Sequence, residues 1–123
     1  MSQNPPDDKL EKMRKQLLPH FKTGFLQRNL TIFQVYFDQG DKPFYLSVEP
    51  ADFSIIDGEH PSPTLTIHCD DQALFWSLLS GRSDGMLAFM DGRYRADGHI
   101  VLSQLLLYLF RDEQQVNIYE VQD

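Results

Sequence analysis

From Leu30 onward the hydrophobic pattern changes from a helical period to a period of two residues, and this change limits the possible folds more than any other feature. Successive side chains of a strand point to opposite faces, so such alternation predicts strands with one buried side. The turn-forming run Asp38 to Lys42 joins the first two candidates into a predicted hairpin. The strand candidates cover residues 30–37, 44–49, 51–56, 64–69 and 93–97.

Runs with helical spacing lie before, between and after these strands. The first predicted helix begins near Lys9, capped by Asp7-Asp8, and breaks at Pro19, which lacks an amide hydrogen. Asp70-Asp71 cap a second helix that ends at Gly81. Shorter and longer apolar helices are expected at residues 86–90 and 99–110. This order favours an α+β fold, with helices on one sheet face and solvent on the other.

Length and charge exclude several classes of protein. The 123 residues predict one domain over 1–123, with a frayed start at 1–6 and a docked tail or edge strand at 112–123. Eleven basic and eighteen acidic residues give a net charge of −7, which argues against nucleic acid as a partner. One cysteine and the absence of an apolar signal core favour a cytoplasmic protein.

The chemically active side chains form no catalytic pattern. His68 and Cys69 are neighbours in a predicted strand, so they point to opposite faces and cannot act as a base and a nucleophile together. The other histidines, His20, His60 and His99, lie in separate segments without metal-ligand spacing. We therefore expect a protein that is not an enzyme and that holds no metal or cofactor.

An excess of apolar residues near the end of the chain needs a structural explanation. The helix expected at 99–110 is apolar on nearly every side, and Met86, Phe89 and Met90 lie close before it. Such a helix must be buried all round, line a cavity or meet a partner. An ordinary core helix and an apolar pocket both remain open at this point.

The first 28 residues are more basic than the rest. They hold six basic and three acidic residues, and the lysines lie off the apolar stripe of the first helix. A basic amphipathic helix can make transient contact with an anionic membrane. The alternative is a solvated helix face whose lysine stems cover apolar surface.

Five short motifs follow one another in the second half of the chain. They are Pro63 to His68, Phe75 to Gly81, Leu87 to Gly92, Arg93 to Gly98 and Ile100 to Phe110. In order and spacing they resemble the sterol carrier protein 2 family, in particular its bacterial standalone members. The first helix and the hairpin of 30–49 also follow the family order. The chain departs from the usual pattern at Arg93, Ala96 and His99.

The resemblance implies a five-stranded, largely antiparallel sheet with helices packed on one face around an apolar tunnel for lipids. It implies non-catalytic binding, transfer or presentation of a fatty acid, acyl-CoA, sterol-like or isoprenoid ligand. Arg82, Arg93 and Arg95 are the candidates for a charged headgroup. The predicted pocket residues are Phe75, Leu79, Met86, Phe89, Met90, Leu102, Leu105, Leu106 and Leu109.

Two other interpretations stay open. The apolar helix could instead be buried in a homodimer or against an enzyme of a lipid or quinone pathway, without a small ligand. A hydrolase acting on acyl groups ranks last, because it needs polar catalytic groups that the sequence does not offer.

Overall fold

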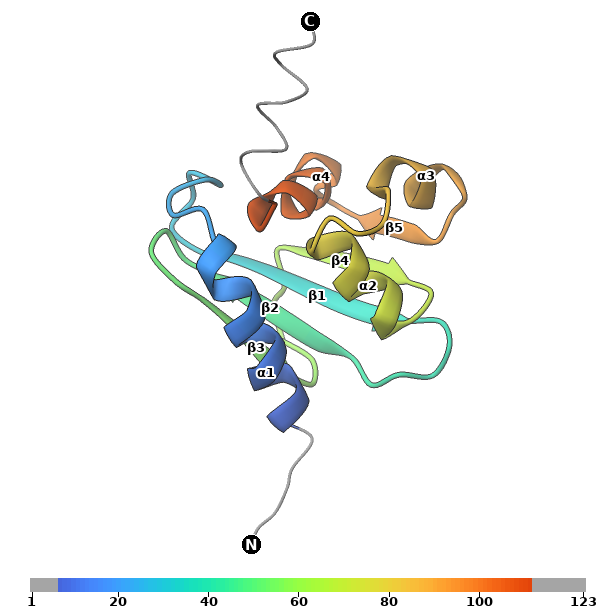
Figure 1. The fold of residues 1–123 in the computed structure, drawn as a ribbon, viewed down its shortest axis with the longest axis horizontal. Helices are drawn as coiled ribbons and strands as arrows, with labels where there is room; N and C mark the ends of the chain where they lie inside the picture. Colours follow the sequence, from blue (N-terminus) through green and yellow to red (C-terminus); the bar gives the residue numbers. More distant parts are fainter. Residues whose placement is uncertain (1–6, 112–123) are drawn as a thin grey trace, which may run out of the picture.

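The computed structural model describes residues 7–111 (Figure 1). The predicted frayed start and the predicted tail therefore lie outside the described residues. Helices and strands follow one another as α1 (Asp7–Leu17), the short 3₁₀ helix η1 (Leu18–His20), β1 (Thr31–Phe37), β2 (Phe44–Val48), β3 (Phe53–Asp57), β4 (Leu65–Cys69), α2 (Gln72–Leu79), α3 (Gly85–Met90), β5 (Tyr94–Asp97) and α4 (Ile100–Leu109).

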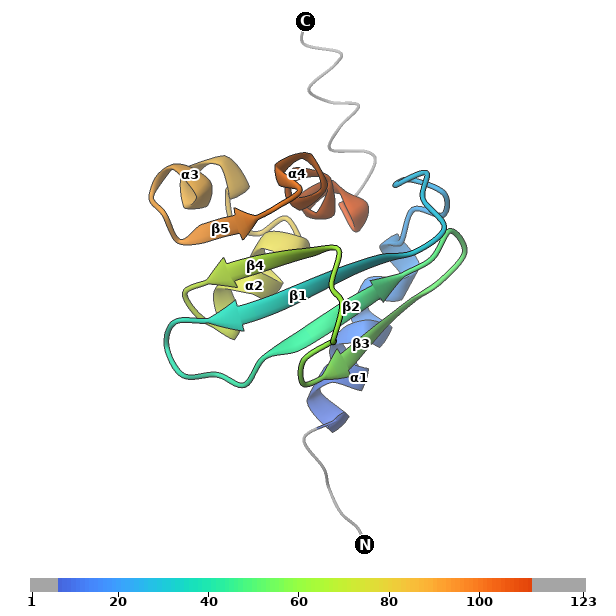
Figure 2. The ribbon, with the colours of Figure 1, turned by 180° about the vertical axis from the view of Figure 1, so that it is seen from behind.

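The five strands form one sheet in the order β3-β2-β1-β4-β5 (Figure 2). Strand β1 pairs with β2, β2 with β3, and β4 with β5 in antiparallel fashion, whereas β1 and β4 run parallel. The predicted α+β class and the largely antiparallel sheet are confirmed. The parallel pair arises because the chain returns from the edge strand β3 to the far side of β1.

The helices lie on one face of the sheet (Figures 1 and 2). Helix α1 packs over β3, α2 and α4 pack over β4, and α3 lies beside β5. Between these layers the core holds fully buried aromatic and aliphatic side chains from both the strands and the helices. They include Phe33, Val35, Phe44, Leu46, Ile67, Phe75, Leu78 and Leu106.

The expectation that the other sheet face meets solvent is wrong at β1. Ile32 and Gln34 point away from the helices, yet they are only 4% and 1% exposed. Figure 2 shows the connection from β3 to β4 crossing this face. Gln34 holds the crossing segment, because its Nε2 donates to the carbonyl oxygen of Gly58 at 3.1 Å and its Oε1 accepts from the amide of His60 at 2.7 Å.

Local sequence signals explain most of the helix ends. Helix α1 stops at Leu17, two residues before Pro19, as predicted. Asp71 caps α2, and its Oδ1 accepts from the amide of Leu74 at 2.8 Å. Asp7 and Asp8 correct the sequence prediction: α1 begins at Asp7, so both residues lie within its first turn and not before it.

Candidate functional site

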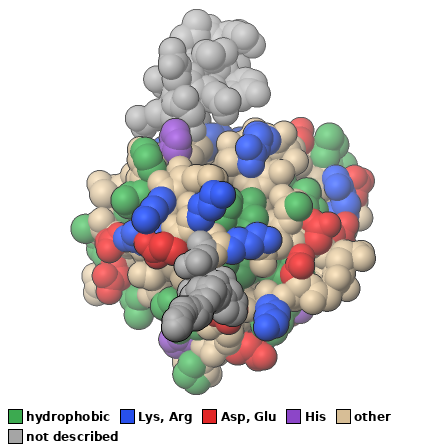
Figure 3. Space-filling model, turned by 60° about the horizontal axis from the view of Figure 1, so that its bottom comes forward, with side chains coloured by type: hydrophobic (Ala, Val, Ile, Leu, Met, Phe, Trp, Pro, Cys, Tyr) green, Lys and Arg blue, Asp and Glu red, His purple; other side chains and the backbone are tan. Residues whose placement is uncertain are grey.

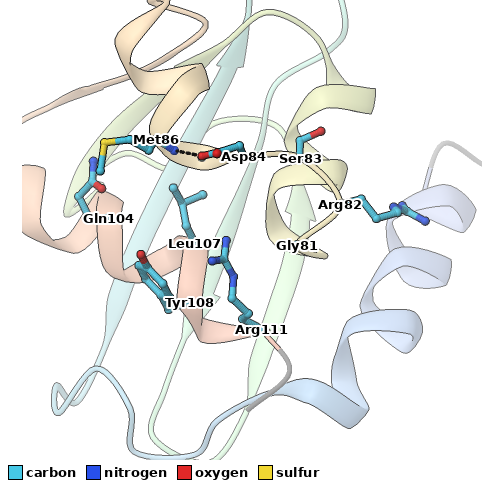
Figure 4. A pocket seen from close by; sticks show the side chains of 10 residues that line it. Gly81, Arg82, Ser83, Asp84, Met86, Gln104, Leu107, Tyr108 and Arg111 are labelled. Atoms are coloured by element: carbon cyan, nitrogen blue, oxygen red, sulfur yellow. Dashed lines mark hydrogen bonds between the residues drawn. The ribbon is translucent and has the colours of Figure 1, made fainter. Parts of the chain in front are cut away.

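A cavity of about 570 Å³ lies between the α2–α3 loop and α4 (Figure 4). One wall is the loop and the first turn of α3, and the other wall is one face of α4 and the residue that follows it. The lining residues are Gly81, Arg82, Ser83, Asp84, Gly85, Met86, Gln104, Leu107, Tyr108 and Arg111.

Two local features of the chain create this cavity. Gly81, with φ at +81°, turns the chain away after α2, a conformation that glycine adopts without strain. Asp84 then begins α3, since its Oδ1 accepts from the amides of Met86 and Leu87. Helix α3 approaches α4 so closely that a Cβ on Gly85 would lie 2.6 Å from Cδ1 of Leu107. Gly85 and Leu107 therefore approach closely at a point where both line the cavity.

Charged residues of both signs line the cavity. Arg111 is half-buried, its guanidinium lies 4.7 Å from the ring centre of Tyr108, and its Nε has no hydrogen-bond partner among the described residues. Figure 4 shows the Arg111 side chain reaching toward the space beside Leu107, whereas Arg82 points away from it. The one carboxylate of the lining, Asp84, already accepts two amides of α3.

Two of the predicted site residues line this cavity, namely Met86 and Arg82. Five others are at most 4% exposed and pack in the core between sheet and helices; they are Phe75, Leu79, Leu102, Leu106 and Leu109. Leu105 is half-buried against the same core. Phe89 and Met90 are 41% and 71% exposed. A lipid between sheet and helices would have to separate packed side chains, so contact between these residues and a lipid stays a prediction.

The other headgroup candidates lie elsewhere. Arg95 pairs with the carboxylate of Asp38, its Nη2 lying 3.1 Å from Oδ2, and also donates to the carbonyl oxygen of Gly92 at 2.6 Å. Arg93 lies 3.7 Å from the carboxylate of Asp91. Neither arginine lines the cavity at the α2–α3 loop. Their role with a headgroup stays a prediction, and their observed partners are surface carboxylates.

Sequence reasoning missed the α4 side of the cavity. Gln104, Tyr108 and Arg111 recur at helical spacing, so they share one face of α4 and its end. The signal was present: Gln104 is one of the few polar residues in an otherwise apolar helix. The pattern nevertheless could not show that the α2–α3 loop would leave open space above this face.

The apolar excess at the end of the chain divides into core and surface. Leu102, Leu106, Leu107 and Leu109 are buried, which accounts for the inner side of α4. Exposed apolar side chains remain on α3 and the first turn of α4. We call this set the exposed apolar residues: Met86, Leu87, Phe89, Met90, Ile100 and Val101, each 41–71% exposed.

Cys69 and His68 do not form a reactive pair. Cys69 is fully buried on the helix side of β4, and burial raises the pKa of its thiol from 9.0 to about 11. His68 lies on the other face, where it stacks on Tyr36 and where its Nε2 is 3.4 Å from a carboxylate oxygen of Asp97. Within residues 7–111, no cluster of three His, Cys, Asp or Glu residues is placed to bind a metal ion.

The basic residues of the first segment have two different roles. Arg14 bonds the carboxylate of Asp52 and the carbonyl oxygen of Phe53, both at 2.9 Å. Lys9, Lys12 and Lys15 remain exposed on α1. Figure 3 shows several Lys and Arg side chains on this side of the molecule, with Asp and Glu among them. No helix in the described part of the chain is long and apolar enough to span a membrane.

Comparison with solved structures shows which fold this is. A ubiquinone synthesis protein, UbiJ-SCP2, superposes with a TM-score of 0.67 at 11% identity, over 88% of this chain and 95% of the other. Palmitated SCP2L2 from Aedes aegypti superposes with a TM-score of 0.58 at 16% sequence identity, over 87% of this chain and 95% of the other. The sec-alkylsulfatase Pisa1 from Pseudomonas sp. superposes with a TM-score of 0.64 at 14% sequence identity, over 89% of this chain but only 17% of that enzyme.

The chain therefore has the fold of sterol carrier protein 2 domains, as the sequence resemblance predicted. In sequence alone, no family model matches it and no curated protein matches it.

Proposed function

We propose that this protein binds a hydrophobic lipid without covalent chemistry and carries it or presents it to an enzyme. The observation that carries the proposal is the cavity of about 570 Å³ beside α4. Its volume lies in the range of small-molecule sites, about 300–1,000 Å³. Leu107, Met86 and the ring of Tyr108 supply apolar lining, and burying apolar ligand surface contributes about 25 cal/mol per Å².

Proteins of the same fold support two ligand classes. One of them is described as palmitated and another as a ubiquinone synthesis protein, so a fatty acyl chain and an isoprenoid quinone intermediate are both candidates. Exposed Lys9, Lys12 and Lys15 would aid transient contact with an anionic membrane during lipid exchange. The enzyme partner in such a pathway would receive the lipid at the cavity mouth.

The experiment is a titration with a fluorescent fatty acid that brightens in apolar surroundings. We expect saturable binding with one site per chain. Gln104→Trp fills the cavity from α4 and should weaken binding at least about tenfold, a free-energy change of about 1.4 kcal/mol. Gln16→Trp, on the exposed side of α1, is the matched control and should leave binding unchanged. Equal affinities for Gln104→Trp and the wild type would refute the cavity as the binding site.

A second candidate function rests on the exposed apolar residues. Six large apolar side chains on α3 and the start of α4 are exposed to solvent. Monomeric proteins rarely expose so many large apolar side chains together, so this set favours an interaction module. This module would form a homodimer or dock on an enzyme. It predicts a concentration-dependent dimer by analytical ultracentrifugation that Met90→Asp disrupts, and no lipid bound to the purified protein.

A further inference from the structure

The position of Arg111 is set by contacts of its main chain. Its amide donates to the carbonyl oxygen of Tyr108 at 3.2 Å, which continues α4 by one tight turn. Its own carbonyl oxygen accepts a hydrogen bond from Nζ of Lys22. The side chain therefore leaves the backbone at a fixed point at the end of α4 and enters the cavity beside Leu107 (Figure 4).

The guanidinium of Arg111 lacks the partners that a partly buried cation normally has. Its Nε is fully buried and bonds no acceptor among the described residues, and none of the ion pairs found there includes it. A buried donor without an acceptor is costly. The contact with the Tyr108 ring satisfies the charge in part but supplies no hydrogen-bond acceptor.

The other charges around the cavity favour an anion at Arg111. Asp84 is the acidic residue of the lining, and its Oδ1 is committed to the amides of Met86 and Leu87. Arg82 is a second arginine of the lining, although its side chain points away from Leu107. Among residues 7–111, the lining thus carries two arginines against one carboxylate, although the whole chain has a net charge of −7.

Beside Arg111 the cavity surface becomes apolar. Leu107 is 3% exposed at the floor, and Met86 is 61% exposed on the opposite wall. Met86 is also one of the exposed apolar residues, so the apolar wall of the cavity reaches the surface of α3. A ligand that fills this space needs an anionic end near Arg111 and an apolar part along Leu107 and Met86.

We propose that Arg111 is a specificity-determining residue that selects lipids with an anionic headgroup, a carboxylate or a phosphate monoester. Its planar fork matches both groups, and charge-assisted hydrogen bonds are about twice as strong as neutral ones. The headgroup pairs with the guanidinium where it reaches into the cavity, while the chain lies on Leu107 and Met86. This inference rests on the proposed lipid binding. It goes further by specifying the charge of the ligand and the residue that recognises this charge.

The test uses three ligands with the same sixteen-carbon chain: hexadecanoic acid, hexadecyl phosphate and uncharged hexadecanol. Each displaces a neutral hydrophobic dye from the full-length protein at pH 8, below the concentration at which the ligand aggregates. For the wild type we expect the anionic ligands to bind at least about tenfold more tightly than the alcohol. The acid and the phosphate arms show which anion Arg111 prefers.

Three variants then test the residue. Arg111→Gln should weaken the binding of the two anionic ligands only, so that the three affinities lie within about threefold of one another. Arg111→Lys should restore part of the preference for the anionic ligands. Arg28→Gln, at an exposed arginine that bonds Oγ1 of Thr31 and does not line the cavity, should behave as the wild type. Circular dichroism confirms that each variant is folded.

The outcomes separate the two proposals. Equal binding of acid and alcohol by the wild type, or an anion preference that survives in Arg111→Gln, overturns the inference while lipid binding stands. Failure of all three ligands and of the dye to bind the wild type overturns the proposed function as well.

Discussion

Nζ of Lys22 donates a hydrogen bond to the carbonyl oxygen of Tyr108 at 2.6 Å, and so joins the segment after α1 to the end of α4. The same ammonium also donates to the carbonyl oxygen of Arg111, and the Lys22 amide donates to that of Leu109 at 3.2 Å. The last carbonyls of a helix carry partial negative charge and lack partners within the helix. Lys22 therefore caps the C-terminal end of α4 next to the cavity.

Replacing Lys22 should destabilise the protein without unfolding it. Lys22→Met keeps most of the apolar stem but removes the ammonium, so we expect the free energy of unfolding to fall by about 1–2 kcal/mol. Urea denaturation measures this change. Lys15→Met, on the exposed side of α1, is the control and should stay within about 0.5 kcal/mol of the wild type. Equal stability of the two variants would show that the contact at α4 is unimportant.

Gln34 should be essential for holding the crossing connection on the sheet. Gln34→Leu leaves the carbonyl oxygen of Gly58 and the amide of His60 without their side-chain partner. We expect a loss of about 2–3 kcal/mol in unfolding free energy, and faster amide hydrogen exchange at residues 58–64. Gln39→Leu, in the exposed β1–β2 turn, should change neither measurement. Unchanged exchange at residues 58–64 in Gln34→Leu would contradict this role.

The thiol of Cys69 should be unreactive in the folded protein and should make stability sensitive to alkaline pH. Its pKa is about 11 when folded, above the usual 9.0, because burial disfavours the thiolate. Below pH 9 both states keep the proton, and stability is unaffected. Between pH 9 and 11 the unfolded chain loses the proton first, so stability falls as pH rises.

Two measurements check the thiol. A disulfide reagent at pH 8 should modify Cys69 only after denaturant is added, and rapid modification of the native protein would contradict its burial. In urea melts between pH 8.5 and 10.5, Cys69→Ala should lose less stability than the wild type. Parallel losses in both proteins would show that the folded thiol has an ordinary pKa.

Gly85 lines the cavity, so a substitution there changes the shape of the cavity directly. In Gly85→Ala the new Cβ would lie 2.6 Å from Cδ1 of Leu107, so the leucine side chain must move. We expect a loss of about 1–2 kcal/mol in stability and weaker binding of the fluorescent fatty acid. Gly40→Ala is the control. It should also lower stability, because residue 40 has a φ of +93° that alanine adopts only with strain, but it lies in the β1–β2 turn, far from α4. If the two variants bind the fatty acid equally well, Leu107 does not contact the ligand.

Much of the fold could be predicted from the sequence because its signals are local. The alternation of Leu65, Ile67 and Cys69, the cap at Asp71 and the break before Pro19 each depend on neighbouring residues, and the structure confirms them. The covered face of β1 could not be predicted, because it results from a connection that crosses the sheet and bonds Gln34.

The site was harder to predict for a similar reason. Gly85 and Leu107 come together in the lining of the cavity from two different helices, a contact between residues that no local pattern connects. The apolar excess of α4 led to a pocket prediction in this region, and a ligand there stays a prediction. However, many of the predicted pocket residues pack in the core. Of the two arginines that line the cavity, Arg82 was among the predicted ones, whereas Arg111, which follows the helix, was not.

Native mass spectrometry of the purified protein, with extraction and identification of any bound lipid, tests the central proposal most directly. We predict a complex of one chain with one lipid, retained in Gln16→Trp and lost or reduced in Gln104→Trp. If the wild type carries no lipid, and incubation with hexadecanoic acid and hexadecanol still produces no complex, the protein is not a lipid carrier. A dimer free of lipid would instead support the interaction module formed by the exposed apolar residues of α3 and α4.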